Sequence, residues 1–339
     1  MTDHFPPLYI NFLNRFDIEA LALTDAEILG AIELGLKLQG EGKTVIEPRV
    51  HLEPGAGQTG HFNVLRGWIG APVHLAGVKV VSDYYDNYKH NLPSELATLL
   101  LMDEATGAPR AILDAMHITD MRTGAVSALG ARHLAPKASK VLANIGARGT
   151  SYWNCRLIAS LFDLDEIRIH SRRPESCAAL ADRLRGELPD KVKVVVTADW
   201  ESCVRGADIV IEASRLVTPE SLLKTEWIKP GALVMPYGTM SAVELSLTGI
   251  MDKILMDDWG QRGGTKGALR QHVDTGALSA QNFYGELGEV IAGNKPGRVR
   301  EDETILFWHR GLSLSDIALG HAMLQKAARL NIGQRLRWA

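Results

Sequence analysis

A stretch that changes from apolar to small residues carries the clearest chemistry in this sequence. Residues 140–145 read Lys-Val-Leu-Ala-Asn-Ile, and the turn that follows consists of Gly146, Ala147, Arg148, Gly149, Thr150 and Ser151. A strand, a glycine turn and a helix in this order present backbone N–H groups and a helix N-terminus to a pyrophosphate. We therefore predict that residues 146–151 bind the diphosphate of a dinucleotide.

A second apolar run, residues 167–170, lies about twenty residues further on and ends in Ser171, Arg172 and Arg173. In a βαβ unit this strand end meets the adenine ribose, where an acid suits the 2′-hydroxyl of NAD(H) and cations suit a 2′-phosphate. Ser171, Arg172 and Arg173 therefore favour NADP(H) as the cofactor, and NAD(H) is the alternative. The alternative is that the arginines only begin a solvated helix at Pro174.

Composition places the chain among globular enzymes rather than nucleic-acid or membrane proteins. Its 339 residues allow two domains, and the formal net charge of -3 offers no electrostatic reason to bind nucleic acid. No apolar run reaches the length of a membrane span, and the first residues lack a signal-peptide core. Cys155, Cys177 and Cys203 have no disulfide or zinc spacing, so we expect reduced thiols in a cytoplasmic protein. The histidines form no metal-binding pattern.

The first part of the chain mixes helix and strand signals. Thr24 and Glu27 form a capping box for a helix that runs to about Gly40. Strand-like runs follow at 45–46, 73–75, 78–81, 99–102 and 111–113, with a hairpin turn at 103–107. A helix of small residues is expected over 119–134. A last helix over 315–330 is expected to pack back on the first segment.

From residue 140 the pattern changes to strands that alternate with helices. The expected strands are 140–145, 166–171, 192–196, 208–212, 232–236 and 253–257. This alternation is typical of a doubly wound parallel sheet. The fold class is therefore α/β, with the dinucleotide unit in the middle and pieces of a second, α+β domain on both sides.

Several further segments carry a resemblance when their order is considered together. They are residues 76–82, 92–94, 113–114, 121–128, the glycine turn, 285–289 and 311–316. Over nearly its whole length the chain resembles the ornithine cyclodeaminase/μ-crystallin family. The resemblance implies a Rossmann domain over 122–312 and a discontinuous substrate-binding and dimerisation domain over 1–121 and 313–339, hence a homodimer. Family members are NAD(P)-dependent cyclodeaminases, amino-acid dehydrogenases and imine reductases that work through α-imino acids.

The resemblance also assigns roles to individual residues. Arg49 and Lys79 match the ligands of the substrate carboxylate, and a guanidinium beside an ammonium suits that anion. Lys79 lies among valines, so burial is expected to depress its pKa and suit it to proton transfer. The alternatives are a surface ion pair for Arg49 and a strand-end lysine with an exposed tip for Lys79.

Other positions match the cofactor site of the family. Ser94 and Arg122 match residues that contact the cofactor phosphates, and Arg122 lies in an otherwise small, apolar helix where an unpaired charge is costly. An internal carboxylate is the alternative partner for Arg122. The remaining matches to this site are Thr123, Ser214, Tyr237 and Gly238.

Two departures from the family pattern affect these expectations. Arg148 stands where a glycine usually allows close approach to the pyrophosphate, so either Gly149 takes that role or the Arg148 side chain points outward. Met240 stands where the cyclodeaminases carry an aspartate that handles the side-chain amine. This loss weighs against ornithine or lysine as substrate.

A third departure lies beside the expected nicotinamide site. Small residues are usual there, but this chain has Phe307 and Trp308 followed by His309, Arg310 and Gly311, which we assign to the substrate site. The added Arg310 suggests a second anionic group on the substrate, as in iminosuccinate, whose reduction gives aspartate. The alternative is that Arg310 pairs with a structural acid such as Asp316.

The resulting hypothesis is an NAD(P)H-dependent reductase of a small α-imino acid, or the reverse dehydrogenase. Arg49 and Lys79 would hold the carboxylate, and Lys79 or a water would transfer the proton. A redox-neutral cyclodeaminase and a crystallin-like protein that binds NADPH without turnover are the alternatives. No metal, nucleic acid or membrane is expected to take part.

Overall fold

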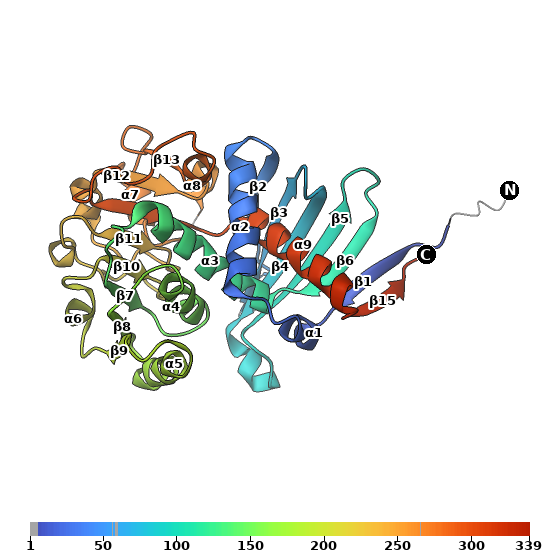
Figure 1. Cartoon of the computed structure of the whole chain (residues 1–339), viewed down its shortest axis with the longest axis horizontal. Helices are drawn as coiled ribbons and strands as arrows, with labels where there is room; N and C mark the ends of the chain where they lie inside the picture. The colour runs from blue at the N-terminus through green and yellow to red at the C-terminus, as the bar shows by residue number, and fades with distance from the viewer. Residues whose placement is uncertain (1–5, 56, 58–59, 265) are drawn as a thin grey trace. The chain divides into compact units, whose positions relative to one another are not determined.

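The chain divides into two compact units, Met1–Arg122 with Leu312–Ala339, and Thr123–Gly311. The computed structural model describes residues 6–55, 57, 60–264 and 266–339. A seven-stranded sheet forms the first unit and an eight-stranded sheet the second (Figure 1). Helix α3 (Met116–Leu134) begins in the first unit and ends in the second, because the boundary follows Arg122.

The sheet of the first unit has the order β15-β1-β6-β5-β4-β3-β2. Its strands are β1 (Tyr9–Leu13), β2 (Thr44–Leu52), β3 (Gly60–Ile69), β4 (Leu75–Tyr84), β5 (Glu95–Asp103), β6 (Pro109–Asp114) and β15 (Gln334–Arg337). Neighbours are antiparallel except β1 and β6, which are parallel. The register of β2 on β3 shifts between Glu47 and Val50, which marks a β-bulge at Pro48 and Arg49.

Helices cover one face of this sheet. Besides α1 (Arg15–Ala20), they are α2 (Asp25–Gly40) and α9 (Ser313–Leu330), and α9 packs on β3, β4 and β5 as well as on α2. The predicted capping box starts α2, since the Thr24 hydroxyl accepts a hydrogen bond from the Glu27 amide at 3.2 Å and the Glu27 carboxylate accepts one from the Thr24 amide at 2.8 Å. Glu27 also pairs with Lys326 of α9 at 2.7 Å, which ties the two helices together.

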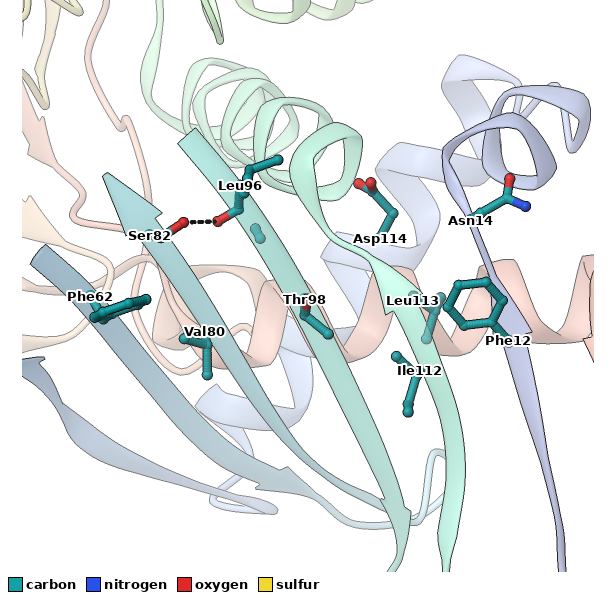
Figure 2. A pocket seen from close by; sticks show the side chains of 11 residues that line it. Phe12, Asn14, Phe62, Val80, Ser82, Leu96, Thr98, Ile112, Leu113 and Asp114 are labelled. Atoms are coloured by element: carbon teal, nitrogen blue, oxygen red, sulfur yellow. Dashed lines mark hydrogen bonds between the residues drawn. The ribbon is translucent and has the colours of Figure 1, made fainter. Parts of the chain in front are cut away.

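The opposite face of the same sheet is open in the single chain. Figure 2 shows the side chains that line a hollow of about 430 Å³ on it, among them Phe12, Phe62, Val80, Leu96 and Ile112. Val80 and Leu96 are 38% and 40% exposed. A sheet face of this kind leaves apolar side chains in water.

The sheet of the second unit has the order β13-β12-β14-β11-β10-β7-β8-β9 and is parallel throughout. Its strands are β7 (Val141–Ile145), β8 (Glu166–His170), β9 (Lys193–Val196), β10 (Ile209–Glu212), β11 (Leu233–Pro236), β12 (Lys253–Met256), β13 (Gly285–Glu286) and β14 (Ile305–Trp308). The order of β7 to β11 is that of a Rossmann fold, and the winding reverses between β7 and β10.

Helices connect these strands. They are α4 (Ser151–Ala159), α5 (Pro174–Glu187), α6 (Trp200–Val204), α7 (Arg270–Asp274) and α8 (Leu287–Ile291). The 3₁₀ segments of the chain are η1 (Tyr85–His90), η2 (Thr225–Trp227), η3 (Leu245–Ile250) and η4 (Trp259–Gly263). Small residues let α3 pack closely here, because a Cβ on Gly124 would lie 2.5 Å from the Cβ of Trp153. No helix among the described residues has the length and apolar character of a membrane span.

Most of the predicted elements are confirmed. All six predicted Rossmann strands are present, α2, α3 and α9 lie where helices were expected, and a turn joins β5 to β6 over 104–106. The strand expected at 73–75 is wrong, since Val73 and His74 form a turn and β4 begins at Leu75. The sequence reading missed β1, β3, β13, β14 and β15.

Candidate functional site

Lys79 lies at the centre of a buried ionic cluster in the first unit. It points from β4 to the face that the helices cover, and only 1% of it is exposed. Its Nζ donates to the Oδ1 atom of Asp316 on α9 at 2.6 Å and to the hydroxyl of Thr119 on α3 at 3.1 Å. The Thr119 hydroxyl in turn donates to the carbonyl of Ala115 at 2.8 Å, so the orientation of this hydrogen-bond chain is defined.

Asp316 also holds a second cation. The Nε atom of Arg122 donates to the same Oδ1 atom at 3.1 Å, and the side chains of Arg122 and Asp316 are 7% and 0% exposed. The other carboxylate oxygen, Oδ2, is buried and has no hydrogen-bond partner among the described residues. The internal carboxylate that was the alternative partner for Arg122 is therefore present, and one carboxylate balances two buried cations.

Arg49 belongs to the same electrostatic cluster. It lies in the bulge of β2, where one extra residue in the strand changes the direction in which a side chain points. The pKa of Lys79 is lowered to about 7, chiefly by burial and also by the Arg122 and Arg49 cations, whereas Asp316 opposes the shift. The structure thus places Arg49 and Arg122 near enough to Lys79 for their charges to act on it, although the sequence had assigned Arg122 to the cofactor phosphates.

Asp120 is a further acid at this cluster, and the sequence reading missed it. Burial raises its pKa to about 6, with a contribution from Glu95, while Arg122 and Lys79 act in the opposite direction. Asp316 entered the sequence reading only as a partner for Arg310. A carboxylate on the buried face of α9 was the signal that could have found it, because such a group needs an internal cation. Ser94, another predicted residue, lies half-buried just before β5.

In the second unit, the glycine turn follows β7 directly. Gly146 and Gly149 have φ angles of +110° and +55°, and a Cβ on Gly146 would lie 2.8 Å from the carbonyl oxygen of Ala213. Arg148 is exposed. Both explanations offered for Arg148 agree with this geometry, since its side chain lies on the surface and Gly149 has the left-handed conformation.

The residues around the turn fit a phosphate group. Ser151 begins α4 and is fully buried, yet its hydroxyl has no hydrogen-bond partner among the described residues. The Asn144 side chain stabilises the turn, because it donates a hydrogen bond to the Gly146 carbonyl at 2.8 Å. An unpartnered hydroxyl at a helix N-terminus, in a turn that begins with a glycine that has no room for a Cβ, fits a bound pyrophosphate.

Tyr237, after β11, connects this turn to the end of β14. Its hydroxyl lies 2.6 Å from the Thr150 hydroxyl and accepts a hydrogen bond from the Asn154 side chain at 2.6 Å. Its ring lies 4.4 Å from the ring of His309. His309 is 1% exposed, and its Nε2 atom lies 3.0 Å from the Ser127 hydroxyl. His309 is therefore held inside the unit by protein groups.

Glu212 is a buried acid at the end of β10 that the sequence reading missed. Its carboxylate accepts hydrogen bonds from the amide of Ser214 at 2.7 Å and from the amide of Gly238 at 3.2 Å, and the Ser214 hydroxyl also donates to it. Burial raises its pKa to about 7, against the effect of these donors. Glu212 thus fixes two predicted cofactor residues, Ser214 and Gly238, to each other.

Arg310 and Gly311 are tied to a different acid from the one suggested. The Asp257 carboxylate accepts hydrogen bonds from the amides of Arg310 and Gly311, both at 2.8 Å. Burial lowers the pKa of the Arg310 guanidinium, and Asp257 opposes this shift. Asp316, the suggested partner, binds Lys79 and Arg122 instead. The Arg310 guanidinium lies close to Gly264, since a Cβ at that position would be 2.8 Å from one of its nitrogens.

The end of β8 carries the residues expected at the adenine ribose. Arg172 forms an ion pair with Glu220, and Arg173 is exposed and precedes α5, which begins at Pro174. The carbonyl of Ser171 accepts a weak hydrogen bond from the Cys177 thiol at 3.8 Å. Thr123, the remaining predicted residue, is buried in α3. No group of metal-binding side chains was found among the described residues.

Comparison with known proteins agrees with this architecture. Residues 10–329 match the ornithine cyclodeaminase/mu-crystallin family. The chain belongs to this family. A curated relative, the N-((2S)-2-amino-2-carboxyethyl)-L-glutamate dehydrogenase of Staphylococcus aureus, is 28% identical over 96% of this chain and 97% of its own length.

Solved structures show the same fold. The Δ1-pyrroline-2-carboxylate reductase of Thermococcus litoralis, in complex with NADH and L-proline, matches with a TM-score of 0.88 and 25% identity over 96% of this chain and all of its own. The iminosuccinate reductase of Paracoccus denitrificans, in complex with NAD+, matches with a TM-score of 0.86 and 25% identity over 97% of this chain and all of its own. The Rossmann-type fold and the family membership expected from the sequence are thus confirmed.

Replacing Asp316 with alanine should strongly destabilise the protein. The substitution leaves Lys79 and Arg122 buried without their shared carboxylate, which typically costs about 3–5 kcal/mol. Chemical denaturation measures the change in the free energy of unfolding. Asp302→Ala is the control, because Asp302 pairs with Arg300 on the surface and its loss should cost less than about 1 kcal/mol. Equal stability of the two variants would contradict the role given to Asp316.

Proposed function

We propose that this protein is an NAD(P)H-dependent oxidoreductase that reduces a small α-imino acid to the amino acid, or catalyses the reverse dehydrogenation. The observation that carries the proposal is the cluster of the buried Lys79 and Arg122 with the half-buried Arg49, which Asp316 balances only in part. Such a cluster attracts a carboxylate. The same chain provides a strand, glycine turn and helix that suit a dinucleotide.

In the proposed reaction the first unit binds the substrate and the second unit binds the cofactor. Arg49 and Lys79 bind the substrate carboxylate, and Lys79, or a water that it orients, exchanges a proton with the substrate nitrogen. A pKa of about 7 lets Lys79 give and take a proton near neutral pH. In the second unit, the turn at 146–151 binds the cofactor diphosphate, and Ser214, Tyr237 and Gly238 bind next to it. The cofactor, when bound, supplies or accepts the hydride.

A dicarboxylic imino acid such as iminosuccinate is the candidate substrate. An iminosuccinate reductase is among the similar structures. The cluster around Lys79 contains the cations Arg49, Lys79 and Arg122, and Asp316 forms ion pairs with two of them, Lys79 and Arg122. The position of Arg310 in the sequence suggested that it binds the second carboxylate of the substrate. The structure supports this role less, because the Arg310 guanidinium is largely buried near Asp257. If it binds substrate, Arg310→Ala impairs turnover of a dicarboxylic substrate more than that of a monocarboxylic one.

The alternatives have less support. An acid for the side-chain amine of ornithine is missing at Met240, and the nearby Glu212 uses its oxygens to bind Ser214 and Gly238. A crystallin-like protein without turnover has no need for a buried lysine with a pKa near neutrality. Ammonia release without net change in nicotinamide absorbance would favour the cyclodeaminase. Cofactor binding without turnover over an imino-acid panel would favour the crystallin-like protein.

The purified protein should oxidise NADPH or NADH when it is given a keto acid and ammonium, with oxaloacetate and pyruvate as the contrasting pair. Lys79→Met should lower kcat/KM by about 10²-fold or more, because it removes both the carboxylate ligand and the proton donor. Lys43→Met, which removes an exposed lysine paired with Glu41, is the control and should retain activity. Full activity of folded Lys79→Met protein would contradict the mechanism.

Reduction should slow as the pH rises through about 7. Lys79 is protonated below its pKa, and the protonated form both binds the carboxylate and donates the proton, so kcat/KM for reduction falls above that pH. Arg49, Asp120, Arg122 and Asp316 are the charged groups coupled to it. A pH profile of kcat/KM measures this inflection. It should disappear in Lys79→Arg if that variant is active, because a guanidinium stays charged, whereas an unchanged inflection would assign it to another group.

We propose further that the chain forms a homodimer through the open face of its seven-stranded sheet. Val80 and Leu96 project from this face beside Phe62 and Ile112, and a second copy would remove them from water (Figure 2). The double variant Val80→Glu with Leu96→Glu should be monomeric by light scattering, because it sets like charges in the interface. Val217→Glu, at an 89% exposed position, should leave the dimer intact. A monomeric unmodified protein would refute the proposal.

A further inference from the structure

One ion pair crosses the edge of the parallel sheet where the cofactor is proposed to bind. Arg172, two residues after β8, pairs with Glu220 in the segment that follows β10. The two side chains are 53% and 54% exposed, and 48 residues separate them in the sequence. The contact therefore reflects the fold of the unit rather than local chain geometry.

The strand order shows what this pair spans. β8 and β10 are the two neighbours of β7, on opposite sides of it. All three strands are parallel, so the segments that follow them leave from the same edge. A contact between the segments after β8 and β10 must pass across the end of β7, where the glycine turn begins.

The backbone of Glu220 is held on the far side of β7. Its amide donates to the carbonyl of Ser241, in the loop after β11, at 3.0 Å, and the amide of Leu222 donates to the carbonyl of Ala242 at 2.8 Å. The Glu220 carboxylate thus has a fixed anchor near the ends of β10 and β11. Arg172 pairs with this carboxylate from the β8 side.

We propose that Glu220 is a specificity-determining residue for the cofactor, because it competes with a 2′-phosphate for the Arg172 guanidinium. This inference rests on the nucleotide site of the proposed function. The Glu220 carboxylate accepts a hydrogen bond from Nη2 of Arg172. A 2′-phosphate that takes this nitrogen displaces the carboxylate, and one that binds the other N–H groups meets its negative charge. NADH has no 2′-phosphate and leaves the pair intact, whereas NADPH has to weaken or break it to engage Arg172. Glu220 therefore shifts the preference of the site toward NAD(H).

Two neighbouring arginines explain why Glu220 changes which of the two cofactors binds more tightly, and not whether a cofactor binds. Arg148 and Arg173 are exposed beside the same strand ends and can meet either nucleotide. Of these three arginines, Arg172 forms an ion pair with a carboxylate from the segment after another strand. A choice between cofactors thus depends on whether Arg172 is available.

Nucleotide titrations test this inference. Dissociation constants of NADPH and NADH are measured from nicotinamide fluorescence for the unmodified protein, Glu220→Gln and the control Glu201→Gln. Glu201 forms a similarly exposed pair with Arg205 on α6. The ratio of Kd for NADPH to Kd for NADH should fall by about twofold to fivefold in Glu220→Gln, as expected for loss of an exposed ion pair, and should stay unchanged in Glu201→Gln.

A double variant shows whether the effect passes through Arg172. In an Arg172→Ala background, Glu220→Gln should no longer alter the ratio. An unchanged ratio in the single variant, or an equal change with and without Arg172, would overturn the inference while leaving the proposed function in place. An unmodified protein that binds neither nucleotide would overturn both.

Discussion

The arrangement of the first unit depends on one carboxylate that serves two cations. Asp316 places a single oxygen within 2.6 Å of Lys79 Nζ and 3.1 Å of Arg122 Nε. The three groups come from β4, α3 and α9, so the ion pair fixes how two helices meet the sheet. Its desolvation is costly, and a buried pair of this kind seldom adds net stability. We infer that it persists because it holds Lys79 in place with a pKa near neutrality and leaves positive charge for an anionic ligand.

In the second unit, hydrogen bonds to the buried Glu212 carboxylate and to the Tyr237 hydroxyl hold the loops at the strand ends. Glu212 binds the backbone after β10 to the backbone after β11, and Tyr237 connects that region to the glycine turn through Thr150 and Asn154. These hydrogen bonds link three neighbouring strand ends at one edge of the sheet. A dinucleotide requires several loops to hold fixed positions at once, and a shared hydrogen-bond network provides this rigidity.

Local patterns in the sequence predicted the features that depend on local structure. The capping box of Thr24 and Glu27, the six strands of the Rossmann sheet and the turn after β7 all follow from periodicity and turn chemistry, and they are confirmed. The pairing of β1 with β15 was not predicted, because no local signal connects strands at opposite ends of the chain. Strand β13 was also not predicted, because its two residues are too few for a periodic pattern.

The same distinction applies to the candidate site. Arg49, Lys79 and Arg122 were identified because the family resemblance marked them, and the structure brings them together. Their charge balance was not predictable, because Asp316 lies 237 residues from Lys79 in the sequence. For the same reason the sequence presented Arg172 as an available cation, whereas the fold supplies Glu220 as its partner. Roles that depend on a distant counter-charge require coordinates.

The position of α9 after the second unit in the sequence has a consequence for biosynthesis. A ribosome makes Lys79 long before Asp316, and the whole of Thr123–Gly311 is translated between them. At ordinary elongation rates that interval lasts about 10 to 50 seconds. The second unit is complete by then, whereas the first has a lysine, but no counter-ion, at the centre of its future core. The nascent first unit therefore acquires α9, and with it the counter-ion of Lys79, only after the second unit has been translated.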